Sequence, residues 1–571
     1  MAHAWSFGDG STGSGVAPSH SYGNNGTFTV TLTVTDNKGA TGTDTAIMTI
    51  ANRAPVANAG SNQSGAPGTS LTFNGTGSSD PDGTITNYTW TFGDGTTGSG
   101  ATVTHAYATA GTYTVTLTVR DDDGAQTSDT ATATVAATGS ETWADSVGST
   151  GADGGYAVAV DDAGNVIFGG TFRGSVDLGG GVSLVSSGGA DWFIVKYTPT
   201  GTPVWAKAIG GLGDEYLESL AVNTAGDVVA TGRFSGSASF GGLPLVALGT
   251  TDIAVAKYRA SDGAHQWSKR FGGAYDDNGN AIAVDGTGAV YLTGYFRGTV
   301  DFGGGILRVP FDTDLDVFVT KLDANGNHVW SKNFSNDGND RGYGIAVDDQ
   351  GTLMVVGSFS NSINFGGGSL VSQNAMTDAF VAKFSSATGA HQWSRQMGAT
   401  DGNETAYGVT IDASGNAVVC GAAVKSVDFG GGSLGALGGS DGFVVTYRGT
   451  TGAHLWSRRI GGTNNDYAYA VAATAGGVVV GGAFEGTASF GGAPVPTSGA
   501  SDAYAAKYDS GGALVWARSV GGIDADVGQD LAMAPSGHPV LVGYFYGTST
   551  FAGTSLTSAG MADAFIVKMA P

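Results

Sequence analysis

Carboxylates recur in seven loops that each follow a tryptophan, and they are the residues best placed to do chemistry. Carboxylate oxygens are preferred calcium ligands, and a ring of them would also attract cationic partners. The plainer interpretation is that these are solvated acidic loops. We predict that the loops emerge on one rim and that metal ligands there include Asp276, Asp277, Asp337 and Asp340. The other acids of the set are Asp153, Asp214, Glu215, Asp401, Glu404, Asp466, Asp524 and Asp526.

Aromatic and basic side chains in the same region suggest a binding face. Tyr216, Tyr275 and Tyr467 lie within the acidic loops, and aromatic rings of this kind can stack on sugars. A separate segment, ILRVPFDTDLD, departs from the repeat and carries Arg308 and Phe311. We predict these five residues as ligand-binding positions on the rim. The alternative is that they are isolated exposed tyrosines and an ordinary loop.

Other reactive residue types follow the repeat and favour structural roles. Four histidines each stand two residues before a tryptophan, too far apart in the chain to build one metal site, and Cys420 lies in the apolar stretch AVVCG. An Asp such as Asp191 opens a strand in every repeat, where it is expected to cap its own turn, and a Lys such as Lys196 follows five residues later in most repeats. The sequence contains no serine elbow, Cys–His pair, zinc helix or phosphate loop, so we predict no enzymatic activity.

The bulk composition excludes several classes of function. The formal charge of −24 would repel a nucleic-acid backbone. No run of 18 apolar residues is present, so we predict no membrane insertion in this chain. The 99 glycines, with abundant Ser, Thr and Asn, indicate turn-rich β structure, and a hydrophobic content of 41% is sufficient for packed cores.

Two related segments at the N-terminus predict antiparallel β-sandwiches. WSFGDGSTGSG at Trp5 recurs as WTFGDGTTGSG at Trp90, and each copy leads to an alternating Thr/Val strand and a tight turn. These motifs resemble the PKD domain family, which implies two Ig-like sandwiches over residues 1–52 and 53–137. The resemblance also implies that Asp80 and Asp82, with Asn52, bind calcium in the turn SSDPDG; a plain Asp turn is the alternative.

The first of these segments begins only at its tryptophan strand, so we predict an incomplete sandwich. An unpaired sheet edge of this kind invites pairing with another chain, and self-association is therefore one expectation. No signal peptide is visible, which we attribute to a natural protein that extends further upstream.

Seven repeats with a period near 60 residues follow, which predicts four-stranded propeller blades. The first Trp strand precedes every other strand of the repeats, and the last repeat lacks one. We therefore predict that the N-terminal Trp strand closes a seven-bladed β-propeller over residues 138–571. The pattern resembles the SBBP family of bacterial β-propeller repeats, which implies a secreted or surface location beside PKD modules. The Trp residues are Trp143, Trp205, Trp267, Trp330, Trp393, Trp456 and Trp516.

Together these observations predict an all-β, non-catalytic, secreted or cell-surface binding or adhesion protein. Its PKD spacers would present a propeller whose acidic rim binds a glycan or a protein, with calcium as the one cofactor. Two alternatives stay open at this point. One is a secreted polysaccharide-active enzyme, a lyase or hydrolase, and the other is a structural surface component that self-assembles.

Overall fold

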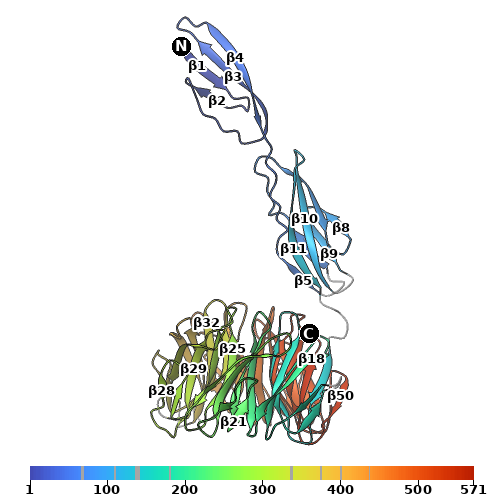
Figure 1. Cartoon of the computed structure of the whole chain (residues 1–571), viewed down its shortest axis with the longest axis vertical. Helices are drawn as coiled ribbons and strands as arrows, with labels where there is room; N and C mark the ends of the chain where they lie inside the picture. The colour runs from blue at the N-terminus through green and yellow to red at the C-terminus, as the bar shows by residue number, and fades with distance from the viewer. Residues whose placement is uncertain are drawn as a thin grey trace. The chain divides into compact units, whose positions relative to one another are not determined.

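The chain folds entirely as β structure in two compact units, Met1–Gly139 and Ser140–Pro571 (Figure 1). No helix occurs among the residues that the computed structural model describes. The predicted boundary between residues 137 and 138 falls in a segment outside this description. The described residues are 1–65, 70–107, 111–135, 142–178, 182–334, 338–372, 376–398, 402–435 and 437–571.

The second N-terminal module is a complete sandwich of two sheets around one core. Alternation of Thr and Val places Val115, Leu117 and Val119 on the inner face, where all three are fully buried with Trp90. The larger sheet has the order β5 (Gln63–Gly65), β11 (Gln126–Val135), β10 (Gly111–Asp121), β7 (Ile85–Thr91) and β8 (Thr97–Ser99), and the smaller pairs β6 (Ser70–Asn74) with β9 (Thr102–Ala106).

The first module has fewer strands than the second and forms only one sheet. Residues 1–52 are all described, and they form a single four-stranded sheet. Val30 and Leu32, which correspond to Val115 and Leu117 of the second module, stay partly exposed because no second sheet covers them. This confirms the predicted incomplete sandwich. Its order is β2 (Thr12–Ser14), β1 (Ala2–Ser6), β3 (Gly26–Thr35) and β4 (Thr41–Ile50).

The second unit consists of seven four-stranded antiparallel blades, and a hairpin of the following blade extends two of these sheets to six strands. The first strand of each blade contacts the first strand of the next, and the circuit returns from the seventh blade to the first, so these strands surround a common axis. From the axis outward, the first three blades are β13 (Gly154–Val160), β14 (Val166–Phe172), β17 (Asp191–Tyr197), β18 (Pro203–Gly211); β19 (Glu215–Val222), β20 (Val228–Phe234), β23 (Asp252–Tyr258), β24 (His265–Phe271); and β25 (Asn278–Val284), β26 (Val290–Phe296), β29 (Asp316–Leu322), β30 (His328–Phe334).

The remaining blades repeat this order, and the last one takes its outermost strand from the start of the unit. The fourth to sixth blades are β31 (Arg341–Val347), β32 (Thr352–Ser360), β35 (Thr377–Ser385), β36 (His391–Met397); β37 (Glu404–Ile411), β38 (Ala417–Val424), β41 (Ser440–Tyr447), β42 (His454–Ile460); and β43 (Asp466–Thr474), β44 (Gly477–Ala488), β45 (Val495–Asp509), β46 (Leu514–Gly522). The seventh is β47 (Asp526–Met533), β48 (Pro539–Phe545), β51 (Asp563–Lys568) and β12 (Trp143–Val147).

The ring closes through β12 and β51, as predicted. The two strands are antiparallel, with Trp143 opposite Lys568 and Val147 opposite Ala564. This pairing joins the start of the propeller to its end and gives the seventh blade its fourth strand. It also removes two free sheet edges, which would otherwise pair with other chains.

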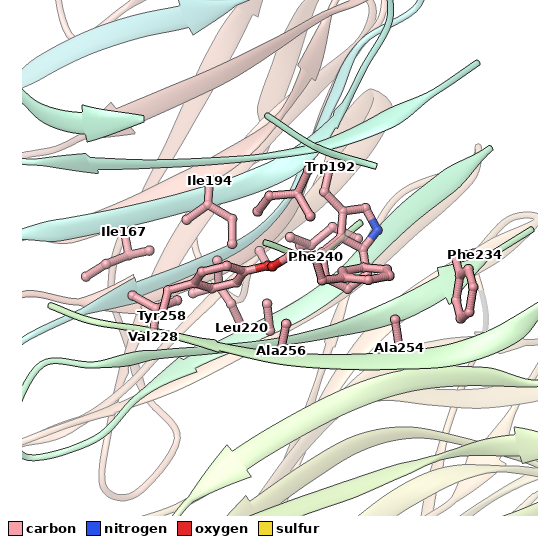
Figure 2. Close-up of a cluster of buried hydrophobic side chains, with 14 of the residues drawn as sticks. Ile167, Trp192, Ile194, Leu220, Val228, Phe234, Phe240, Ala254, Ala256 and Tyr258 are labelled. Carbon is pink, nitrogen blue, oxygen red and sulfur yellow. The ribbon is translucent and has the colours of Figure 1, made fainter. Parts of the chain in front are cut away.

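Neighbouring blades are held together by apolar cores and by a repeated polar brace. Ile167 and Trp192 of the first blade pack with Leu220 and Val228 of the second (Figure 2). Six of the seven Trp indoles of the repeat then donate a hydrogen bond to a turn carbonyl of the next blade, which explains why Trp recurs in the repeat. These bonds run from Trp143, Trp205, Trp267, Trp330, Trp393 and Trp456 to Pro199, Ala260, Ala324, Ser386, Gly449 and Ser510, at 2.9–3.2 Å.

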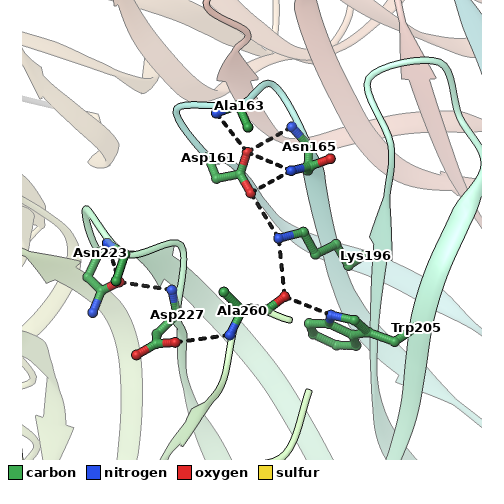
Figure 3. A network of polar contacts seen from close by, with 9 residues as sticks. Asp161, Ala163, Asn165, Lys196, Trp205, Asn223, Asp227 and Ala260 are labelled. Atoms are coloured by element: carbon green, nitrogen blue, oxygen red, sulfur yellow. Dashed lines mark hydrogen bonds and ion pairs between the residues drawn. The ribbon is translucent and has the colours of Figure 1, made fainter. Parts of the chain in front are cut away.

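The repeated lysine reinforces this brace. Lys196 donates to the Asp161 carboxylate at 2.9 Å and to the same Ala260 carbonyl that accepts from Trp205 (Figure 3). Both ionic side chains are buried, so the ion pair is protected from solvent screening. The repeated Lys therefore has a structural role, as the sequence indicated, and at this junction it links a turn aspartate of one blade to a turn carbonyl of the next.

Closure can be tested by placing a charge at the seam. Val147→Asp puts a carboxylate at a fully buried position of β12, and we expect a loss of about 3–5 kcal/mol in unfolding free energy, because an uncompensated buried charge costs that much. Denaturant unfolding of the whole chain measures it. Val204→Asp, on the exposed side of an equivalent Trp strand, is the control and should change stability little. Equal losses in both variants would contradict the assigned seam.

Candidate binding site at the propeller axis

The predicted acidic rim is mostly buried, which corrects the expectation of solvated acidic loops, whereas metal binding by these acids stays a prediction. Asp277 and Asp340 have no exposed surface, Asp276 is partly exposed, and Asp337 and Asp401 lie outside the described residues. The acids turn inward because each closes the loop that precedes its strand. The others that are buried are Asp153, Glu215, Glu404, Asp466 and Asp526.

Each buried acid ties together the backbone at one blade junction. Glu215 accepts a hydrogen bond of 2.7 Å from the amide of Gly211, and Asp191 accepts one of 2.7 Å from the amide of Ser187, so the predicted turn cap is confirmed. The two carboxyls flank Gly210, where a Cβ atom would lie 2.5 Å from Glu215 Oε2 and 2.8 Å from Asp191 Oδ1. A glycine is therefore required beside the pair.

The carboxyl pairs disfavour full ionisation. Burial, with the neighbouring acid second to it, raises the pKa of Glu215 to about 7 and that of Asp340 to about 8. Burial likewise raises the pKa of Asp277 to about 7 and that of Asp526 to about 6. Asp191 Oδ1 and Glu215 Oε1 are buried and have no hydrogen-bond partner. Protonation of one carboxyl of a pair relieves both the burial of charge and the repulsion between the two acids.

The predicted aromatic and basic residues divide between two regions. Arg308 belongs to β28 (Ile306–Arg308), which contacts the outermost strand β30, and Phe311 follows it with 55% of its surface exposed. Tyr275 is 40% exposed and packs against Gly298. These three residues are therefore peripheral, whereas Tyr216 and Tyr467 lie near the axis.

A one-residue bulge in every innermost strand creates the axial cluster. The register of each first strand against its second strand skips one residue, and the side chains at these positions meet between blades. Ring centroids of Tyr343 and Tyr407 are 5.7 Å apart, and those of Tyr407 and Tyr469 are 5.1 Å apart. We call the seven positions the axial ring: Tyr156, Glu218, Asn280, Tyr343, Tyr407, Tyr469 and Gln529.

One side of the axial ring is aromatic. Tyr467 stacks on Tyr469 with centroids 5.5 Å apart and planes 7° from parallel, which extends the row begun by Tyr343 and Tyr407. Burial is the main cause that raises the pKa of Tyr407 to about 12, so this phenol is a neutral donor at physiological pH. We call Tyr343, Tyr407, Tyr467 and Tyr469 the aromatic arc.

The other side of the axial ring is polar and charged. Arg233 forms an ion pair with Glu218 at 2.8 Å and lies over the ring of Tyr216, with 4.6 Å between guanidinium and centroid. Asn278 donates to the same Glu218 oxygen at 3.1 Å. Further round, Arg341 lies 5.4 Å from the ring centre of Tyr295. Fixed polar groups beside aromatic faces are the usual composition of a small-ligand site.

None of the seven axial-ring residues was predicted as a site residue, because a bulge changes which side chain faces inward. A signal was available, however. All seven positions stand three residues before a column of small residues in the repeat, such as Ala159 or Ala346. Four of the seven are tyrosine, and the rest vary, which is unlike the invariant structural positions.

The predicted calcium turn of the second module brings several oxygens together. Asp80 Oδ2 and Asp82 Oδ1 are buried without a hydrogen-bond partner, and Asp122 Oδ1 and Asp80 Oδ2 flank Gly83. Burial first, then the neighbouring aspartates, raises the pKa of Asp80. Asn52 donates to Asp121 at 2.8 Å. In the described part of the chain, no three His, Cys, Asp or Glu side chains gather as a metal cluster.

Comparison with known proteins identifies the modules. Residues 1–50 and 52–137 match the PKD domain, and residues 266–295 match the SBBP β-propeller repeat. The N-terminal unit is a pair of PKD domains. A solved PKD1 domain of Vibrio anguillarum Epp is 39% identical, with 15% of this chain and 99% of that chain covered and a TM-score of 0.14. PKD domains are typical of extracellular proteins, so the modules together indicate an extracellular type of binding or adhesion protein.

The curated relatives are more distant. "Regulatory protein FlaEY" of Caulobacter vibrioides is 27% identical over 67% of this chain, and "Uncharacterized WD repeat-containing protein L264" of Acanthamoeba polyphaga mimivirus is 24% identical over 34% of it. The aligned regions span only 42% and 17% of those two proteins. Among the described residues, no helix is long and apolar enough to cross a membrane.

The carboxyl pairs predict an unusual dependence of stability on pH. Because the pKa of Asp526 is about 6 in the folded chain and lower when unfolded, its stabilising contribution is largest in acid and is lost as pH rises through 6. Through Asp526, the unmodified chain should lose about 1–3 kcal/mol of unfolding free energy between about pH 4.5 and 7.5. The Asp526→Asn variant should not show this part of the loss. Unfolding free energy measured across this range tests the expectation.

Asp162→Asn is the control, because Asp162 is exposed in a propeller turn away from Asp526. The groups that face Asp526 are Asp502, Asp524, the Ser549 hydroxyl and the Gly522 amide. An Asp526→Asn variant whose stability falls as steeply with pH as that of the unmodified chain would contradict the raised pKa of Asp526.

Proposed function

We propose that this is a non-catalytic, secreted or cell-surface binding protein whose propeller takes a glycan at the axial ring. The observation that carries the proposal is the aromatic arc, in which four tyrosines from three adjacent blades lie together with their rings partly exposed. Apolar faces of sugar rings pack on aromatic rings, and phenolic hydroxyls can bond to sugar hydroxyls.

The charged groups near the axis support binding over catalysis. Hydrolysis of a glycosidic bond needs two carboxyl groups free to exchange protons. Glu218 is held by Arg233 and Asn278, and Asp530 accepts hydrogen bonds from the amides of Val158 and Leu531. Neither is arranged as a free acid or base. Such fixed polar groups would instead orient a bound ligand.

We also propose that calcium binds at the Asp80 turn of the second PKD domain. The unpartnered oxygens of Asp80 and Asp82 supply two ligands, and the nearby carboxylates would be relieved of mutual repulsion by a cation. The ion would rigidify the turn. This site is distinct from the propeller and is not needed for glycan binding there.

Removal of one ring of the aromatic arc tests glycan binding. Tyr407→Ala should weaken glycan binding by about tenfold, because a stacked aromatic contact contributes about 0.5–1.5 kcal/mol and 1.4 kcal/mol is a factor of ten. A glycan array identifies bound sugars, and calorimetric titration then gives their affinity. Tyr275→Ala is the control, since Tyr275 packs against Gly298 and not on the arc. Equal weakening by both variants, or a blank array, would overturn the axial assignment.

Calcium binding is tested separately. Titration of calcium into the whole chain should release measurable heat with a dissociation constant of about 0.1–1 mM, the range of extracellular modules. Asp80→Asn should abolish the heat by removing one ligand oxygen. Asp44→Asn, exposed in the first module, is expected to leave it unchanged. Heat that survives in Asp80→Asn would place the ion elsewhere.

A further inference from the structure

The two arginines near the axis differ in whether a carboxylate forms an ion pair with them. Arg233 is paired with Glu218 at 2.8 Å. Arg341 forms no ion pair with a carboxylate among the described residues, and its guanidinium lies over the face of Tyr295. The adjacent Asp340 is buried, and burial raises its pKa although the charge of Arg341 acts to lower it. Arg341 therefore lacks a direct ion-pair partner in a chain of net charge −24.

This cation adjoins the aromatic arc. Arg341 and Tyr343 lie two residues apart on β31, and Tyr343 contacts Tyr407 of the next blade. On the other side, Asn280 donates 2.7 Å to the carbonyl of Gly342, which fixes the strand between them. A guanidinium held on an aromatic face keeps a planar fork for a carboxylate, and such charge-assisted bonds are about twice as strong as neutral ones.

We infer that the axial site takes a glycan with a carboxylated sugar, whose carboxylate binds Arg341 while a sugar ring packs on the aromatic arc. The inference rests on the proposed glycan binding and deepens it. The strongly negative charge of the whole chain disfavours long polyanions, because each further carboxylate is repelled and, of the two described arginines near the axis, Arg341 is the one without an ion pair. The expected ligand is therefore a short or mostly neutral glycan with one acidic sugar.

The test compares carboxylated oligosaccharides with their carboxyl-reduced counterparts on the full chain. We expect the carboxylated form to bind about tenfold more tightly, with a preference that declines as salt rises. Arg341→Gln should remove the preference and leave the weaker, neutral binding. Arg341→Lys should retain part of it, since the charge remains but the fork is lost. Tyr407→Ala should weaken both forms alike.

Arg308→Gln is the matched control, because Arg308 is exposed at the outer edge of the third blade. Unchanged thermal unfolding of Arg341→Gln would confirm that the variant is folded. Equal binding of carboxylated and reduced sugars would overturn this inference while the proposed function stands. Absence of binding by every glycan would overturn both. A preference that persists in Arg341→Gln would also refute the assignment to this arginine.

Discussion

Pairing of β12 with β51 is the interaction on which the propeller depends. Seven sheets can share one axis only if the last sheet meets the first, and here the meeting is made by backbone hydrogen bonds within a single sheet. Closure brings the seven innermost strands into one circuit, and every later feature follows from that circuit. The Trp and Lys side chains hold neighbouring blades together. At the junction of the first and second blades, the Ala260 carbonyl accepts hydrogen bonds from both Lys196 and Trp205.

The closed ring also explains why acids are buried at the junctions. Where a Trp strand ends and the next blade begins, the chain turns sharply and several backbone amides lose their partners. Carboxylates such as Asp466 supply acceptors at short range, as in the 2.7 Å bond from Gly462. This arrangement places a second carboxyl, that of Asp441, near Asp466. A glycine is needed at position 461, because a side chain there would clash with both carboxyls. Each junction thus satisfies its backbone amides within a small volume. The raised pKa values of the junction carboxyls are a consequence of this crowding.

The sequence was sufficient for the architecture because period, strand alternation and the displaced Trp strand are all local patterns. It was insufficient for the site, for two physical reasons. An aspartate in a glycine-rich loop has the same pattern whether it faces water or backbone amides, so Asp277 was expected on the surface and is buried. A bulge shifts side-chain orientation without changing composition, so Tyr343 and Tyr407 were not anticipated, whereas Tyr216 was. Arg308 lies in the predicted loop, on β28 beside the outermost strand β30, and its ligand binding stays a prediction.

Symmetry separates the structural positions from those able to recognise a ligand. The junction acids keep one chemical type round the described circuit, as expected if every blade makes the same closure. The axial ring has equivalent backbone geometry at seven positions but carries four tyrosines, a glutamate, an asparagine and a glutamine. Closure requires a bulge there but no particular side chain. The aromatic arc and the charged side opposite it therefore arise from variation that the fold leaves free, and an asymmetric ligand needs an asymmetric ring.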